Sequence, residues 1–146
     1  MILRPATAAE LDATLPLVAE FYADFGFPWD TARKRALLAD LLARPDLGGL
    51  WLVQREGGVI GYALVAHYFS LEYDGRVALL DEFWITPAQR GAGLGGAVLE
   101  ALEARLRADG VGVVRLEVEA RHARASGLYA RHGYEPGGRE MWTKRL

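Results

Sequence analysis

The 146-residue sequence predicts a single α/β domain, spanning 1–146, in which a mixed β-sheet carries helices on both faces. Apolar runs of strand length alternate with stretches of helical periodicity. Turn signals at Gly57-Gly58 and Asp74-Gly75 join three of these runs into an antiparallel meander. A glycine-rich stretch then leads into a helix and another strand, the pattern of a right-handed crossover between parallel strands. The predicted order is β-α-α-β-β-β-α-β-α-β.

Two helices are predicted in the N-terminal part of the chain. Thr7 and Glu10 have the spacing of a capping box, which marks the start of the first helix. Its apolar face carries Leu11, Leu15, Val18 and Phe21. The sequence FGFPWD interrupts this helix, and a second helix is expected to run to Leu42 after a cap at Asp30 or Thr31.

The strands and the remaining helices follow from periodicity and turn residues. Strands are expected at 2–5, on both sides of Glu56-Gly57-Gly58 within 50–69, at 77–85, at 111–120 and at 139–146. The strand at 77–85 is mostly apolar, as a strand covered on both faces should be. A third helix carries Leu94, Val98, Leu102 and Leu106 at four-residue intervals and ends at Gly110. A short helix at 123–132 is closed by Gly133.

Composition excludes several function classes. The chain has no Cys, which removes disulfides and thiolate chemistry, and His67, His122 and His132 lack metal-ligand spacing. We therefore expect no metal. The net charge of -2 argues against nucleic-acid binding. No apolar run reaches the roughly 18 residues of a membrane span, and no signal peptide is visible, so we expect a cytoplasmic protein without a membrane partner.

The glycine-rich stretch RGAGLGG, residues 90–96, lies between a predicted strand and a predicted helix. The first N–H groups of a helix have no partner within the helix, and the helix dipole makes that end partly positive. Glycines let an anion approach the backbone, and Arg90 adds a cation. The stretch therefore predicts a phosphate or pyrophosphate site. A tight turn without a ligand is the alternative. The spacing fits neither a Rossmann fingerprint nor a P-loop.

Two motifs in this order resemble the GNAT superfamily of N-acyltransferases. RGAGLG after DEFWITPAQ is similar to its acyl-CoA-binding loop, Gln/Arg-x-x-Gly-x-Gly/Ala. ARASGLYARHGY, residues 123–134, is similar to its second signature, in which Leu-Tyr precedes Gly-Phe/Tyr. The predicted element order is also the family's order. The family often has Asn seven residues before the motif tyrosine, where this chain has His122.

The resemblance implies that acetyl-CoA is the acyl donor. The loop residues Arg90, Gly91, Ala92, Gly93, Leu94, Gly95 and Gly96 would hold the pyrophosphate through backbone N–H groups. The backbone of Phe83, Trp84 and Ile85, mainly that of Phe83 and Ile85, would pair with the pantetheine arm, while their side chains belong to the core. This pairing requires the fourth and fifth strands to splay apart.

Acyl transfer to an amine needs a neutral amine, a stabilised oxyanion and a proton for the leaving thiolate. The resemblance places Tyr129 beside the donor as the general acid, although a tyrosine packed on a short helix is the simpler reading. Asp81 and Glu82 are adjacent carboxylates in an apolar strand, which are costly to bury unpaired. One of them is expected to face the ligand as base or amine-binding anion; ordinary salt bridges at a sheet edge are the alternative.

The acceptor is expected to be a small cationic amine. Residues 67–95 resemble the diamine (spermidine/spermine) acetyltransferase branch, although the acidic pair here is Asp-Glu rather than Glu-Asp. Glu72 could extend the acidic surface or could be a solvated turn residue. Tyr22 and Trp29 supply aromatic rings suited to a cation.

The sequence therefore predicts an acetyl-CoA-dependent N-acetyltransferase that transfers an acetyl group to a primary amine, polyamine-like, by direct attack in a ternary complex. Without Cys no thiol can carry the acetyl group. Alternatives are acetylation of a protein N-terminus or lysine, a coenzyme A-binding module without catalysis, and a nucleotide-binding domain. The resemblance and Trp142 in the last predicted strand suggest a homodimer.

Overall fold

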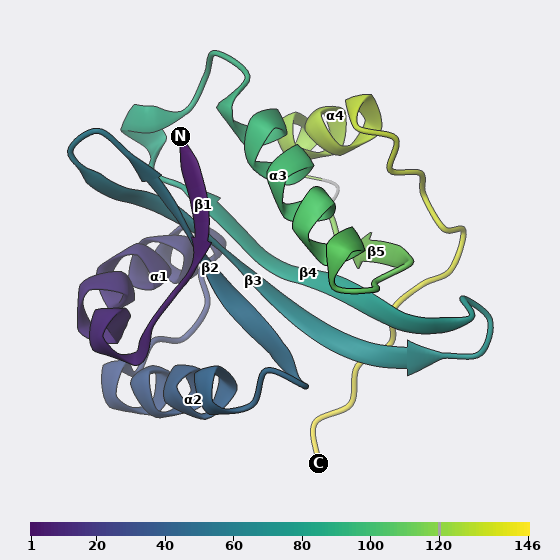
Figure 1. The fold of residues 1–146 in the computed structure, drawn as a ribbon, viewed down its shortest axis with the longest axis horizontal. Helices are drawn as coiled ribbons and strands as arrows, with labels where there is room; N and C mark the ends of the chain where they lie inside the picture. The colour runs from purple at the N-terminus through teal and green to yellow at the C-terminus, as the bar shows by residue number, and fades with distance from the viewer. Residues whose placement is uncertain (120) are drawn as a thin grey trace.

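The computed structural model describes residues 1–119 and 121–146 and contains one five-stranded sheet in the order β1-β2-β3-β4-β5 (Figure 1). Its strands are β1 (Ile2–Pro5), β2 (Gly48–Arg55), β3 (Gly58–Ser70), β4 (Gly75–Ile85) and β5 (Val113–Leu116). Neighbours from β1 to β4 are antiparallel, and β4 and β5 are parallel. The predicted meander and the parallel crossover are both confirmed.

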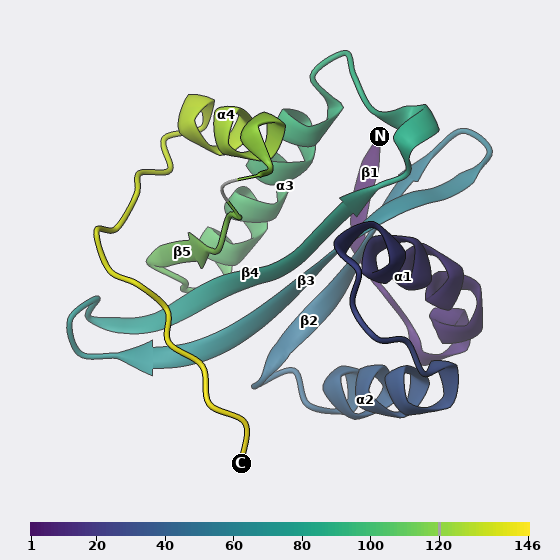
Figure 2. The ribbon, with the colours of Figure 1, turned by 180° about the vertical axis from the view of Figure 1, so that it is seen from behind.

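The helices lie on both faces of the sheet. They are α1 (Leu11–Phe25), α2 (Thr31–Ala43), α3 (Leu94–Ala108) and α4 (Ala123–Arg131), with short 3-10 turns η1 (Ala8–Glu10) and η2 (Pro87–Gln89). Seen from the front and from behind, α1 and α2 lie on one side of the sheet, and α3 and α4 lie on the other (Figures 1 and 2). The mixed sheet covered on both faces is thus confirmed.

The helix caps follow the sequence signals. The Thr7 N–H donates to the Glu10 carboxylate, so the predicted capping box forms ahead of η1 and α1. The Asp30 side chain accepts from the N–H of Arg33 and caps α2. Within the described residues, no helix is long and apolar enough to cross a membrane.

The predicted last strand, 139–146, is wrong. This segment carries no strand in the structure, and Trp142 within it is 86% exposed. Arg139 instead forms a bidentate ion pair with Glu72 in the β3–β4 turn, at 2.8 and 2.9 Å. Strand propensity becomes a strand only where an apolar face is buried against a neighbour, and the segment buries none. The strand predicted at 111–120 is shorter than expected, and its residue 120 lies outside the described part of the chain.

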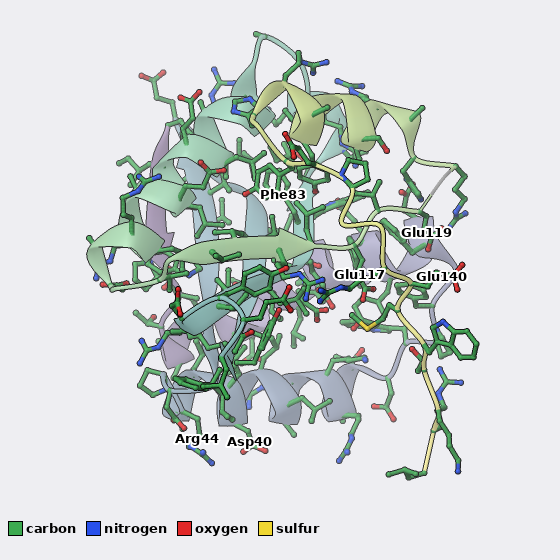
Figure 3. All side chains as sticks on the ribbon, turned by 90° about the vertical axis from the view of Figure 1, so that its right-hand side faces the viewer. Asp40, Arg44, Phe83, Glu117, Glu119 and Glu140 are labelled. Carbon is green, nitrogen blue, oxygen red and sulfur yellow. The ribbon has the colours of Figure 1, made fainter. Side chains whose placement is uncertain are left out.

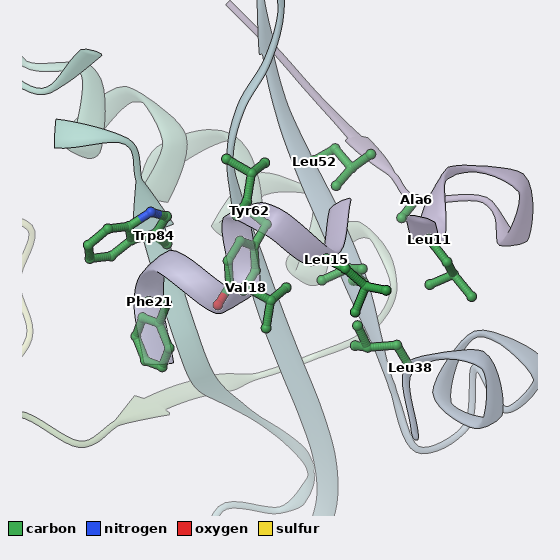
Figure 4. Close-up of a cluster of buried hydrophobic side chains, with 11 residues drawn as sticks. Ala6, Leu11, Leu15, Val18, Phe21, Leu38, Leu52, Tyr62 and Trp84 are labelled. Atoms are coloured by element: carbon green, nitrogen blue, oxygen red, sulfur yellow. The ribbon is translucent and has the colours of Figure 1, made fainter. Parts of the chain in front are cut away.

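The sheet separates two hydrophobic cores. The first core fills the space between the sheet and helices α1 and α2, and Figure 4 shows Phe21 and Trp84 at one end of it, Tyr62 nearer the middle, and Leu11 and Leu38 at the other end. The second core lies under α3 and consists of two clusters that Leu3 and Phe83 both contact. One includes Leu80, Leu99 and Leu102, and the other includes Leu94 and Val98. Each face of the sheet is therefore anchored by its own helices.

Replacing Leu52 with alanine is expected to destabilise the protein by about 3 kcal/mol, because this side chain on β2 is completely buried in the first core. Urea denaturation followed by circular dichroism measures the loss. The matched control is Leu37→Ala on α2, a leucine 43% exposed, which should change stability by less than about 1 kcal/mol. Equal losses in both variants would contradict the described core.

Candidate acceptor and donor site

An extra residue in β4 decides which way its two carboxylates point. Leu64 of β3 pairs with Glu82, but the next residue, Val65, pairs with Leu80, so Asp81 forms a β-bulge. Side chains alternate along a strand, and the extra residue reverses that alternation. Leu80 therefore faces the core under α3, while Glu82 and Trp84 face α1. The bulge thus places the Glu82 carboxylate on the α1 side of the sheet.

Glu82 is held by two tyrosine hydroxyl groups. Tyr22 on α1 donates to Oε1 at 2.9 Å, and Tyr62 on β3 donates to Oε2 at 2.7 Å. Burial raises the pKa of the Glu82 carboxyl, and the two tyrosine hydrogen bonds partly oppose that rise. A carboxylate with a raised pKa is a stronger base than an exposed one. Glu82 is therefore suited to accept a proton.

Aromatic rings and one ammonium group surround Glu82 on the α1–α2 side. The Tyr22 ring lies 5.4 Å from the Trp29 ring in a T-shaped contact, and the Trp29 indole donates to the Thr31 hydroxyl. Lys34 on α2 donates to the Tyr22 hydroxyl at 3.2 Å, and its Nζ lies 4.4 Å from the centre of the Tyr22 ring. These contacts form a chain from Lys34 through Tyr22 to Glu82.

Asp81, the bulged residue, is in a different environment from Glu82. It is more exposed, and none of the hydrogen bonds or ion pairs found among residues 1–119 and 121–146 includes its carboxylate. Partial burial raises the pKa of Asp81. Neither carboxylate forms an ion pair within the described residues, so the structure does not support the alternative of ordinary salt bridges for this pair.

β4 and β5 separate after four residue pairs. Their pairing ends at Leu80 and Leu116, whereas β4 continues to Ile85. The Thr86 N–H donates to the Ile60 carbonyl of β3 at 2.9 Å. Backbone groups alternate along a strand, so those of Phe83 and Ile85 point away from β3, toward the side that β5 leaves. Figure 3 shows Phe83 between β5 and α4 in this view. The predicted splay is present.

The glycine loop ends in the N-terminus of α3. Gly91, Ala92 and Gly93 all have positive φ, at 114°, 48° and 76°. A Cβ added to Gly91 or Gly93 would meet no atom within 4 Å, so both face open space. The N–H groups of Arg90 and Leu94 are bonded to Pro87 and Gly91 carbonyls. The N–H groups left to meet an anion are therefore those of Gly91, Ala92, Gly93, Gly95 and Gly96.

Two of the glycines also serve helix packing. A Cβ on Gly95 would lie 3.1 Å from Leu128, and one on Gly96 would lie 2.4 Å from the His132 ring. Both contacts join α3 to α4. The glycines of the loop thus have two roles: Gly91 and Gly93 shape the turn, while Gly95 and Gly96 let α4 approach.

Arg90 is turned away from the loop. Its guanidinium lies 4.2 Å from the centre of the Trp84 ring, and its Nε donates to the Ile85 carbonyl at 2.7 Å. The expectation that this side chain points at an anion in the loop is therefore not met by its position. Pairing of a ligand with the Ile85 carbonyl would require this hydrogen bond to open. The Phe83 backbone has no such competitor among the hydrogen bonds of the described residues.

Tyr129 is held by the end of α4. The N–H groups of Gly133 and Tyr134 donate to the carbonyls of Ala130 and Tyr129, which is a Schellman motif, and Gly133 has φ of 82°. The Tyr129 ring packs edge-on against Tyr134, whose hydroxyl donates to Glu103. Burial raises the pKa of Tyr129 to about 12. Its hydroxyl makes no hydrogen bond within the described part of the chain.

The structure brings most of the predicted acceptor residues close together. Tyr22, Trp29 and Glu82 lie together. Glu72 does not belong with them: it lies in the β3–β4 turn, bound to Arg139, and β4 separates it from Glu82 by roughly 20 Å. This placement favours the alternative that Glu72 is a residue of the turn, and its role as an acceptor residue stays a prediction.

Two residues of the site were not predicted. Tyr62 carries a hydroxyl within the apolar run VIGYALVA, and a buried tyrosine hydroxyl usually requires a partner. The need of this hydroxyl for a hydrogen-bond partner is the signal by which Tyr62 could have been predicted. Lys34 gives no such signal, because lysine is common on exposed helix faces.

No group of three side chains suited to a metal occurs among the residues that the structure describes.

Comparisons with known proteins identify the family. The acetyltransferase (GNAT) family model matches residues 15–134. An IAA acetyltransferase of Azospirillum brasilense is 27% identical over 127 residues, which is 87% of this chain and 80% of that protein. An L-methionine sulfoximine/L-methionine sulfone acetyltransferase of Pseudomonas aeruginosa is 34% identical over 112 residues. That match covers 76% of this chain and only 63% of the relative, less than two thirds of its length.

Solved structures agree with this result. An integron cassette protein from the mobile metagenome of Cole Harbour Salt Marsh has a TM-score of 0.87 and 30% identity, covering 99% of this chain and 90% of its own. An aminoglycoside N-acetyltransferase in complex with CoA has a TM-score of 0.83 at 14% identity, covering 99% and 93%, and shows likeness of fold alone. The predicted enzyme class, N-acetyltransferase, is confirmed, and the chain belongs to the acetyltransferase (GNAT) family.

Proposed function

We infer that this protein transfers an acetyl group from acetyl-CoA to a small primary amine within a ternary complex. The observation that carries the proposal is the separation of β5 from β4 after Leu80, which leaves the outer edge of β4 unpaired. Glu82, a half-buried carboxylate, faces α1 from β4, and Tyr129 packs against the core on the α3 side. The loop at 91–93, with open space and positive φ, fits a pyrophosphate. The free backbone of Phe83 fits a pantetheine arm.

Each side chain of the site has one role in the proposed acetyl transfer. The cationic amine first loses one proton to solvent, and its neutral nitrogen attacks the thioester carbonyl carbon while a second proton passes to Glu82, directly or through water. A C–N bond forms and the C–S bond breaks. The sulfur leaves with the electron pair, and Tyr129 donates a hydrogen bond to it. Tyr22 and Tyr62 hold the Glu82 carboxylate in place during these steps.

The relatives support a small-molecule acceptor, because the names of both curated relatives describe acetylation of small molecules. A cationic amine suits the carboxylates of Glu82 and Asp81 beside the rings of Tyr22 and Trp29. The polyamine-like acceptor stays a prediction, as do a protein acceptor, a cytoplasmic location and a homodimer. Acetylation without a thiol carrier on the enzyme predicts intersecting rather than parallel lines in initial-rate plots.

The experiment that tests the proposal measures thiol release from acetyl-CoA over a panel of amines. The panel contains polyamines, amino acids, aminoglycosides and N-terminal peptides. Calorimetry with coenzyme A runs in parallel. Turnover of any small amine supports the proposal. Binding of coenzyme A without turnover on every amine would favour the module without catalysis. Displacement of coenzyme A by ATP would favour the nucleotide-binding alternative.

Replacing Gly93 with alanine is expected to weaken coenzyme A binding about tenfold, because alanine at φ of 76° costs about 1–2 kcal/mol and shifts the loop. Calorimetry measures the Kd. The matched control is Gly138→Ala in the C-terminal segment, a glycine with φ of 66° that also faces open space. If both substitutions leave the Kd unchanged, the loop is a structural turn and not an anion site.

A further inference from the structure

The acceptor side of the site contains a positive charge as well as negative ones. Lys34 is half-buried on α2, and its ammonium donates to the Tyr22 hydroxyl, which in turn donates to Glu82. None of the ion pairs found in residues 1–119 and 121–146 includes Lys34. Arg35, the next residue on the helix, is paired with Asp12.

The position of Lys34 is fixed rather than free. Its Nζ lies over the Tyr22 ring at 4.4 Å as well as against the Tyr22 hydroxyl at 3.2 Å. A partly desolvated ammonium group that lacks an anionic partner is costly, and a ligand that supplies the anion recovers that cost. The ammonium of Lys34 and the carboxylate of Glu82 are separated by a single tyrosine hydroxyl.

We propose that Lys34 binds the carboxylate of a zwitterionic acceptor, such as an α-amino acid, whose amine is directed to Glu82. The inference rests on the proposed function and deepens it by naming the acceptor class. An α-amino acid carries its amine and carboxylate two bonds apart, which suits two opposite charges separated by one hydroxyl. A polyamine would instead bring a second ammonium group toward Lys34, and like charges repel.

The test compares L-amino acids with their methyl esters as acceptors for the wild-type protein. The ester keeps the amine and the side chain but removes the negative charge. The amine of the ester has a lower pKa than the amine of the free acid, so a larger fraction of it is neutral. If Lys34 plays no part, the ester should therefore be the better acceptor. We expect kcat/KM for the free acid to exceed that of the ester by about tenfold or more, as one charge-assisted hydrogen bond provides.

Lys34→Met should lower kcat/KM for the free acid about 10-fold to 100-fold, mainly through KM, and leave the ester within about twofold. Lys34→Arg should retain most of the preference for the acid. Arg33→Met, which removes the exposed cation one position earlier on α2, is the matched control and should behave as wild type.

Three results would overturn the inference. In the first, the wild-type protein prefers the ester, or prefers spermidine to every amino acid. In the second, Lys34→Met lowers the rates for acid and ester equally, which would mean that Lys34 acts on Glu82 through Tyr22. In the third, no amine of any class is acetylated by protein that binds coenzyme A; this outcome alone also removes the proposed function.

Discussion

Replacing Tyr129 with phenylalanine is expected to lower kcat by about 100-fold or more, the usual size of the effect of a positioned proton donor. The affinity for coenzyme A should change less than about twofold, because the ring stays packed against the core under α3 and against Tyr134. Burial raises the pKa of the Tyr129 hydroxyl to about 12, so it keeps its proton throughout the working pH range. Steady-state kinetics and calorimetry measure the two quantities.

The raised pKa also defines how Tyr129 can act. A thiol has an ordinary pKa of about 8.5, so full transfer of a proton from this phenol to a thiolate is unfavourable. Tyr129 is therefore expected to stabilise the sulfur mainly as a hydrogen-bond donor while its charge develops. Ionisation of this tyrosine should cause no loss of kcat between pH 8 and pH 10, a range chosen to lie below its pKa of about 12.

The matched control is Tyr134→Phe, since Tyr134 packs edge-on against Tyr129 and its hydroxyl donates to Glu103 on α3. That change removes a tyrosine hydroxyl from the same helix end but keeps the Tyr129 hydroxyl and the ring packed against it, and kcat should stay within a few-fold of wild type. An unchanged kcat in Tyr129→Phe would remove the residue from the reaction. Equal losses in both variants would point to a structural effect at the end of α4.

Replacing Glu82 with glutamine is expected to lower kcat/KM by about 100-fold to 10,000-fold, because the amide cannot accept the proton of the amine. In the wild-type protein the base must be ionised. Burial raises the pKa of Glu82 above its ordinary value, near 4.5, so kcat/KM should fall as pH is lowered through that raised pKa. The fall should be absent from the pH profile of Glu82→Gln.

Asp81→Asn tests the neighbouring carboxylate under the same conditions. The bulge leaves Asp81 more exposed and without the two tyrosine hydroxyls that hold Glu82, so this change should cost much less than Glu82→Gln. The reverse order of effects would make Asp81 the base. Tyr62→Phe removes one of the two hydrogen bonds that favour the ionised carboxylate, and should move the acid limb to higher pH.

Local sequence signals were enough to predict most of the fold. The turn at Gly57-Gly58, the capping box of Thr7 and Glu10, the cap at Asp30, and the glycine loop before α3 are all set by residues within a few positions of one another. The parallel pairing of β4 and β5 follows because a helix joins them. These features depend on backbone chemistry that can be recognised along the chain.

The remaining features depend on contacts between distant segments. Which of Asp81 and Glu82 faces α1 is decided by a bulge in the pairing of β3 and β4, and nothing local to the pair marks it. Lys34 and Tyr22 come from separate helices and meet Glu82 from β4. The segment 139–146 was predicted as a strand, but within the described part of the chain it pairs with no edge of the sheet. Registers and partners of this kind are properties of the folded chain.

The division of the molecule into two cores has a consequence for how its descendants can diverge. The loop at 91–93 and Tyr129 belong to the α3–α4 side, whereas Tyr22, Trp29 and Lys34 belong to the α1–α2 side. Because the sheet lies between the cores, we expect substitutions in the helices of one core to change the packing of the other core little. A lineage can thus exchange one amine for another through α1 and α2 alone and inherit its acetyl donor unchanged.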